Sequence, residues 1–290
     1  MSQPAADRAA QLAAHYDQCA ATVRDADRDR WLASLFAPAP KRPHLHALAA
    51  FAVEAARVRD LVSSPGPGEI RLQWWVDAIE GEARGDVRGH PVADALIDTI
   101  STFRLPRRAL TDLLEARRFD LYEDPMPDVE AIEAYCGRTS AMILRLSAIV
   151  LADGTEPGGA ACAGYAGVAT GVTALLRAFG HHAGQGRLYV PADMLAAHGM
   201  TPAAALARPA PPGLGAALGE LRALARRRHA QARDSLGEVS PQARAAFLPL
   251  AVTPLHLDRL DGVKNPYEEP APTPQWRRQW AIWRMARRLG

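Results

Sequence analysis

The sequence predicts an all-α protein that forms one domain around a central helix. Nineteen consecutive residues, Gly158 to Leu176, carry no charge. Apolar residues in and just beyond this stretch recur at the spacing of one helical stripe, at Tyr165, Val168, Val172, Leu175 and Phe179. No segment shows the strict apolar–polar alternation that is typical of a half-buried strand, and no short internal repeat is visible. A helix that is apolar nearly all round is buried in a core, and its glycines and alanines are too weakly hydrophobic to predict a membrane span.

The other elements follow in order from the same spacing. Residues 7–36 have a helical pattern that ends at a cluster of prolines. Further helices are expected at 46–62, 69–82, 92–103, 106–122, 129–151, 191–198, 216–236, 241–260 and 275–289. Loops rich in proline, glycine or acidic residues separate several of them, at 63–68, 85–91, 123–128, 152–159 and 264–274. We expect the central helix to end at Gly184 or Gly186, and the segment 201–215 to be a mobile flap.

These patterns predict a helical domain over residues 1–263. Residues 264–290 are expected to form a linker and a basic amphipathic helix that packs on or near that domain. Trp276, Trp280 and Trp283 lie on one stripe of this helix, among five arginines. An interfacial membrane helix is one interpretation. We favour the other, in which the tryptophans pack back onto the core and the arginines face water.

Composition excludes several classes of protein. A net charge of +2 gives no electrostatic reason to expect nucleic-acid binding. The three cysteines are widely spaced without a CxxC motif, so they predict neither a disulfide framework nor a zinc site. The N-terminus carries acidic residues and no apolar segment, so we expect no signal peptide and a cytoplasmic location.

Few residues stand out as candidates for metal or nucleophilic chemistry. Carboxylates spaced i, i+4 occur at Asp94 with Asp98 and at Asp120 with Asp124, and we interpret them as solvated helix faces. His181 and His182 are adjacent, about 100° apart on a helix, so they cannot both bind one ion. There is no G-x-S-x-G motif.

Taken together, these segments resemble the squalene/phytoene synthase family over most of the chain. The resemblance lies in the strings DRWLASLFAP, LAAFAVEAARVRD, GEIRLQWWVDAI, GHPVADAL, RRFDLYED, YCGRTS and LLRAFGHHAGQGRLYVP. The last string is the most specific, because the family's second motif is followed by the same Gly-Arg-hydrophobic-Tyr-hydrophobic-Pro exit. The resemblance implies an isoprenoid-synthase-type helical bundle around a central cavity. It also implies a head-to-head condensation of two prenyl diphosphates, with Mg²⁺ held by two Asp-rich motifs on facing helices.

Both Asp-rich motifs depart from the family pattern. The first-motif positions are Ala56, Arg57 and Asp60, so one aspartate is retained. The second-motif positions are Ala178, His181 and His182, and no carboxylate remains there. Matching residues are retained elsewhere, at Asp120, Arg177, Arg187 and Tyr189, whereas the family's Gln and Asn are replaced by Gly171 and Ala174. We expect no metal, no cofactor and no catalytic residue, and we expect Arg57 to lie where the family places a cation.

The altered motifs are similar to those of a family branch known from mitochondria. That branch assembles respiratory complex I and is peripheral on the inner membrane. The resemblance implies a binding or assembly factor with a protein partner such as a respiratory-complex subunit, cytoplasmic or peripheral on an inner membrane. Two alternatives stay open. One is a prenyl-diphosphate transferase that uses Mg²⁺ with Asp60, Asp120 and one histidine, and the other is a non-catalytic carrier of an isoprenoid or other lipid.

Overall fold

The computed structural model describes residues 3–289, and its regular elements are helices. In chain order, the α-helices are α1 (Gln3–Ala26), α2 (Arg28–Ser34), α3 (Arg42–Arg57), α4 (Pro65–Glu80), α5 (Pro91–Phe103), α6 (Arg107–Arg117), α7 (Val129–Cys136), α8 (Met142–Leu151), α9 (Ala160–Arg177), α10 (Phe179–Gly184), α11 (Ala192–Ala197), α12 (Pro202–Leu206), α13 (Leu214–Ser235), α14 (Thr253–Asp261) and α15 (Gln275–Leu289). The 3₁₀-helices are η1 (Ala39–Lys41), η2 (Val58–Leu61), η3 (Val87–Gly89), η4 (Arg118–Leu121), η6 (Leu236–Glu238) and η7 (Pro241–Val252), and η5 (Gly137–Ala141) is a π-helix. Within residues 3–289, β-pairing is limited to one isolated bridge between Gly158 and Val239. The predicted all-α class is confirmed.

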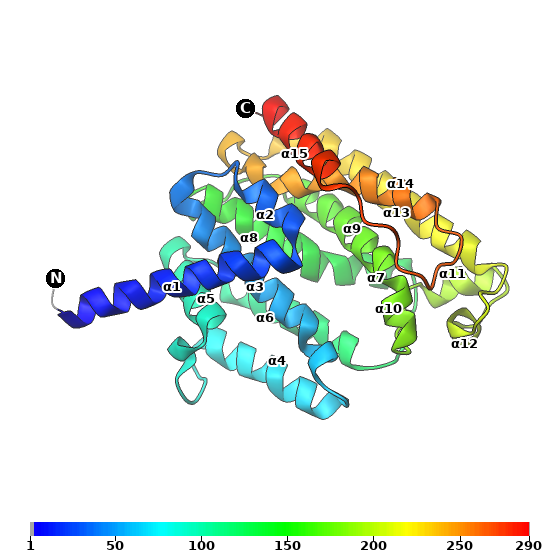
Figure 1. Cartoon of the computed structure of the whole chain (residues 1–290), viewed down its shortest axis with the longest axis horizontal. Coiled ribbons are helices and arrows are strands. Elements are labelled where there is room, and N and C mark those ends of the chain that lie inside the picture. Colours follow the sequence, from blue (N-terminus) through cyan, green and yellow to red (C-terminus); the bar gives the residue numbers. More distant parts are fainter. Residues whose placement is uncertain (1–2, 290) are drawn as a thin grey trace.

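The central helix α9 packs most extensively against α13 and also against η5 and α8 (Figure 1). Its small-residue face makes this close approach possible. A Cβ atom at Gly167 would overlap the backbone of Ala141, and one at Gly171 would lie 2.8 Å from Cys136 Sγ. Glycine is therefore required where α9 crosses the π-helix.

The central helix is shorter than expected. It ends at Arg177, and Ala178 leaves the helical conformation at φ −91°, ψ 8° before α10 begins. The turn is tied to a distant segment, because a Cβ atom at Gly180 would overlap the carbonyl of Tyr267. The chain thus changes direction at the second-motif positions: Ala178 lies at the junction, and His181 and His182 lie on α10 instead of on the central helix.

Two other expectations need adjustment. The predicted helix 241–260 is divided into η7 and α14, because Pro249 and Pro254 remove backbone donors. The segment 201–215 contains α12, and the Tyr267 hydroxyl donates hydrogen bonds to the carbonyls of Ala205 (2.8 Å) and Ala207 (2.7 Å). Its mobility stays a prediction.

The orientation predicted for the C-terminal helix is wrong. Trp276, Trp280 and Trp283 are 64%, 54% and 40% exposed, whereas Ile282 on another face of α15 is fully buried. Ile282 packs against a cluster formed by η7 and α2, together with the partly buried Met285 and Leu289. The aliphatic face of α15 packs on the domain, and the tryptophan stripe, which lies on another face of the helix, is therefore exposed.

Candidate functional site

A cavity of about 560 Å³ lies among α3, α9, the α1–α2 junction and α15. Ala56 of α3 and Ala174 and Arg177 of α9 line it, so the helix that carries the first motif and the helix that precedes the second motif face the same space. No residue of 201–215 lines this cavity. The volume falls in the ordinary range for small-molecule sites.

The first-motif positions point in different directions. Ala56 lines the cavity, but Arg57 is exposed and is not part of the cavity wall. The helix ends at Arg57, and the position expected for its charge, where the family places a cation, stays a prediction. Asp60 lies beyond the helix end, in η2, and its carboxylate is 39% exposed.

The Asp60 carboxylate binds the segment that follows the second motif. Arg187 Nη2 donates to Asp60 Oδ1 at 3.1 Å, and Gln185 Nε2 donates to the same oxygen at 3.3 Å. His181 Nε2 lies 3.5 Å from that oxygen, although 58% of the histidine side chain is exposed. Arg187 itself is 5% exposed. A buried guanidinium thus supplies a positive charge between the two motif segments.

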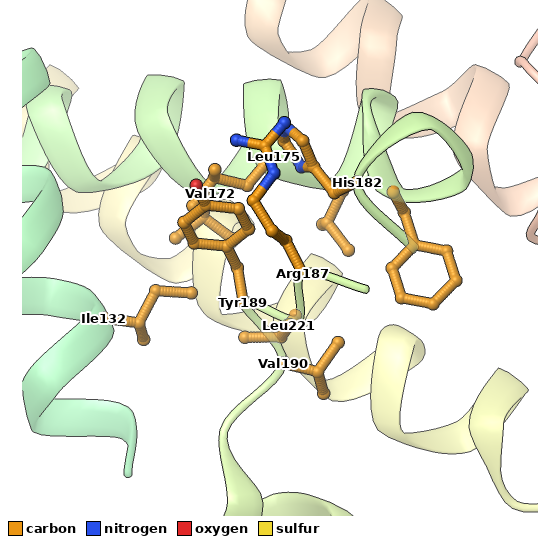
Figure 2. Close-up of a pocket in the computed structure, with 10 residues that line it drawn as sticks. Ile132, Val172, Leu175, His182, Arg187, Tyr189, Val190 and Leu221 are labelled. Carbon is orange, nitrogen blue, oxygen red and sulfur yellow. The ribbon is translucent and has the colours of Figure 1, made fainter. Parts of the chain in front are cut away.

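His182 belongs to a different environment from its neighbour. Its ring lies against that of Tyr189, with centroids 4.8 Å apart, and both residues line a small apolar pocket with Arg187 (Figure 2). Burial lowers the pKa of His182 to about 4, with the charge of Arg187 adding to the effect. The imidazole is therefore neutral at pH 7. It does not line the larger cavity, and Ala178 does not line it either.

Asp120 is enclosed by hydrogen-bond donors. Its carboxylate accepts hydrogen bonds from the hydroxyl groups of Tyr189 (2.6 Å) and Tyr135 (2.8 Å) and from Arg117 Nη1 (3.1 Å). Its side chain is 5% exposed, so the prediction of a solvated helix face is wrong for Asp120. It is also wrong for Asp94, whose side chain is 2% exposed and pairs with Arg8 and His15. Burial and the Asp120 charge raise the pKa of Tyr189. This environment is that of a structural carboxylate.

The ligand set of the transferase alternative is not brought together. Asp60 binds Arg187, and Asp120 binds Arg117 with two tyrosines. Neither aspartate lines the 560 Å³ cavity. Over residues 3–289, no group of three or more His, Cys, Asp or Glu side chains is arranged to hold a metal ion.

The cavity does contain acids, which sequence reasoning missed. Asp25, Asp27 and Asp29 line it from the junction of α1 and α2. Asp29 Oδ2 lies 3.0 Å from His256 Nε2, and Asp29 Oδ1 accepts from Arg278 at 2.9 Å. Burial raises the pKa of Asp29, but the hydrogen bond from His256 and the charge of Arg278 outweigh it, and the net shift is downward. The two partners are more than 220 residues away in the chain, so no local pattern could have indicated them.

The other two acids of this junction also have basic neighbours. Asp27 caps α2 through the amide of Arg30 and accepts from the Arg30 guanidinium at 2.7 Å. Asp25 lies 3.5 Å from Arg24. The arginines of the cavity wall outnumber its acids; they are Arg28, Arg30, Arg117, Arg177 and Arg278. This excess of positive charge suits an anionic ligand better than a divalent cation.

Comparisons with known proteins agree with this architecture. The family model described as squalene/phytoene synthase matches residues 23–284. Curated relatives include the NADH dehydrogenase (ubiquinone) complex I, assembly factor 6, of Homo sapiens, 29% identical over 187 residues that make up 64% of this chain and 55% of the relative. A 15-cis-phytoene synthase of Synechocystis is 28% identical over 206 residues, which make up 66% of this chain and 60% of the relative. The chain spans just over half the length of the assembly-factor relatives that it matches.

Two solved structures share the fold. A squalene synthase, HpnC, from Alicyclobacillus acidocaldarius superposes with a TM-score of 0.70 at 24% identity, covering 86% of this chain and 94% of that one. A dehydrosqualene synthase in complex with ligand gives a TM-score of 0.78 at 17% identity, over 97% of this chain and 99% of that one. Both similarities concern the fold. Within the described part of the chain, no helix combines the length and hydrophobicity needed to cross a bilayer.

Proposed function

Because the chain belongs to the squalene/phytoene synthase family, we propose that it has lost the family's condensation reaction and acts by binding, as an assembly or accessory factor of the respiratory complex I type. The retained cavity and fold make it a binding scaffold. Its partner is a protein, and we take respiratory-complex subunits as the first candidates.

The state of Asp60 is the observation that carries the loss of catalysis. It is the one carboxylate left at the aligned motif positions, and its Oδ1 atom binds Arg187 at 3.1 Å. Mg²⁺ needs several hard oxygen ligands in near-octahedral geometry. One carboxylate that already faces a buried guanidinium offers too few oxygens, and the arginine charge repels an approaching cation.

The assembly role is supported by the names of relatives. Assembly factor 6 proteins of Homo sapiens, Bos taurus and Rattus norvegicus are 28–30% identical to this chain over its matching part. Phytoene synthases match with 27–28% identity. We extend the proposal to location: the protein works at the cytoplasmic face of an inner membrane, held there peripherally.

A direct assay tests the loss of catalysis. Purified protein is incubated with farnesyl or geranylgeranyl diphosphate, Mg²⁺ and NADPH, beside an active phytoene synthase as the positive control. We expect diphosphate substrates to be recovered unchanged. Formation of squalene, hydroxysqualene or phytoene with turnover on a scale of seconds to minutes would overturn the proposal.

A genetic assay tests the assembly role. Deletion of the gene in its host should reduce fully assembled complex I on native gels and lower NADH oxidation by isolated membranes, and the full chain should restore both. The amount of another respiratory complex serves as the internal control. Unchanged complex I in the deletion strain would contradict the assembly role without affecting the catalytic result.

A second candidate function is a non-catalytic carrier of an isoprenoid. The 560 Å³ cavity favours it, because Arg177 and Arg117 line the same space as Ala56 and Ala174. A prenyl alcohol, added without metal, should then raise the melting temperature. A prenyl diphosphate should raise it further in the wild type than in Arg177→Gln. The absence of any shift with either compound would count against this function.

A further inference from the structure

The outward face of α15 is an unusual surface for a globular helix. Trp276, Trp280 and Trp283 follow one stripe at i, i+4 and i+7, and at least 40% of each side chain is exposed. Large aromatic side chains are normally buried in a core or an interface. Three exposed tryptophans on one face of a helix form an apolar patch, and such patches mark interaction sites.

The tryptophans are held in place by their neighbours on the same helix. The rings of Trp280 and Trp283 stack with centroids 4.8 Å apart and planes 23° apart. The guanidinium of Arg277 lies 5.3 Å from the centre of the Trp276 ring, and that of Arg287 lies 5.3 Å from the centre of the Trp283 ring. These contacts keep indole rings and positive charges on one surface.

The charge of α15 is entirely positive. The helix contains five arginines and no acid. Arg278 points inward and binds Asp29 at 2.9 Å, which fixes the rotation of the helix on the domain. The other arginines are exposed and have no salt bridge within the described residues; they are Arg277, Arg284, Arg287 and Arg288.

We infer that the outer face of α15 docks on an anionic lipid bilayer, with the helix lying in the plane of the interface. Tryptophan is enriched at the level of lipid headgroups, and arginine binds their phosphates. A second copy of this chain is a poor occupant, because a symmetric contact would place the α15 arginines of both copies against one another. An amphipathic basic helix with tryptophans on its exposed face has the chemistry of an interfacial anchor.

This inference deepens the membrane location of the proposed function by assigning it to one helix. The test measures sedimentation of the full chain with vesicles of phosphatidylcholine containing 30% phosphatidylglycerol, and with pure phosphatidylcholine. We expect binding to the anionic vesicles only, with a blue shift of tryptophan fluorescence. Binding should weaken in 1 M salt.

Three variants identify the surface. The first neutralises the four exposed arginines of α15 (R277Q, R284Q, R287Q, R288Q). At about fivefold per arginine it should weaken binding by about two to three orders of magnitude. The second replaces the tryptophans (W276A, W280A, W283A) and should weaken binding at least about tenfold and remove the fluorescence shift. The matched control removes four exposed arginines from the α4–α6 side (R71Q, R84Q, R88Q, R108Q) and should bind within about threefold of the wild type.

The outcomes separate the possible failures. All three variants replace exposed side chains, so their melting temperatures should match that of the wild type, which the same samples check. Equal weakening in the control and the α15 arginine variant would mean unspecific charge attraction, and the inference would be wrong. Binding that survives both α15 variants would place the contact elsewhere while leaving the membrane location intact. The docking inference would be overturned if the wild type failed to sediment with anionic vesicles. It would also be overturned if the wild type formed a dimer that the tryptophan variant did not form. Complex I assembly in the deletion strain is measured independently of all of these.

Discussion

Asp120→Asn is the sharpest test of how the buried polar cluster behaves. The substitution keeps the shape of the side chain but removes the negative charge that faces Arg117 at 3.1 Å. Asp120 and Arg117 are 5% and 19% exposed, so the pair is largely shielded from water. Breaking a buried pair by removing one charge costs about 3–5 kcal/mol. We expect the low end, because the Asn carbonyl oxygen still accepts from one tyrosine.

That cost is converted into a melting temperature through the unfolding entropy. A chain of 290 residues unfolds with an entropy of about 0.6 kcal/mol per kelvin, so a cost of about 3 kcal/mol lowers the melting temperature by about 5 °C. Differential scanning calorimetry at pH 7 measures it. The matched control is Asp124→Asn, an exposed acid four residues along the chain, which should change the melting temperature by less than about 1 °C. If Asp120→Asn melts within about 2 °C of the wild type, the carboxylate is not the structural partner of Arg117.

Three further predictions concern titration, packing and the link between the motifs. Burial raises the pKa of Glu54 to about 7, so its ionisation destabilises the fold as pH rises from about 4.5 through 7. Glu54→Gln should therefore raise the free energy of unfolding by about 1–2 kcal/mol at pH 8, a value reduced to allow for a side chain that is 31% exposed. The gain should shrink towards zero near pH 4.5. Urea denaturation at both pH values measures it. Gly167→Ala should lower the free energy of unfolding by at least about 2 kcal/mol, because the new methyl group would overlap the backbone of Ala141. Gly164→Ala, on the same helix, places its methyl group in open space and should raise the free energy of unfolding by about 0.5–1 kcal/mol. Equal effects of the two variants would refute the close approach of α9 to η5. Asp60→Asn should lower the free energy of unfolding by about 1 kcal/mol, because it removes the carboxylate that faces Arg187. Added Mg²⁺ should leave the melting temperature of the wild type unchanged. A Mg²⁺-dependent rise would contradict the pairing of Asp60 with Arg187 in place of a metal.

The parts of the fold that could be predicted depend on local spacing. The stripe through Val168 and Val172 predicts a buried α9, and both residues are in the core. The break at Ala178 could not be predicted in the same way. It depends on the close approach of Gly180 to Tyr267, a contact between residues 87 positions apart in sequence.

The candidate site divides along the same line. The loss of acids at the motif positions can be seen in the sequence, because it is a matter of residue identity. The side-chain directions depend on where each helix ends, and so Arg57 faces solvent while Ala56, one residue earlier, lines the cavity. The partners of Asp29 are held by tertiary packing and leave no pattern in the DRDRW string.

The pair formed by Asp60 and Arg187 explains how the two motif segments can stay together when the metal ligands are gone. In the family chemistry, a bound cation offsets the charge of facing acids and of the departing diphosphate. Here the acids at 178, 181 and 182 are absent, so no cluster of negative charge needs that cation. The remaining aspartate, Asp60, instead faces the guanidinium of Arg187, whose Nη2 atom lies 3.1 Å from Asp60 Oδ1. The family pattern carries the same aspartate and the same exit arginine, so this pair is a retained contact, and what sets this chain apart is the absence of the other acids. With one carboxylate left, and that one already paired, the two segments are joined by a contact that needs no substrate, which is what a preorganised binding scaffold requires.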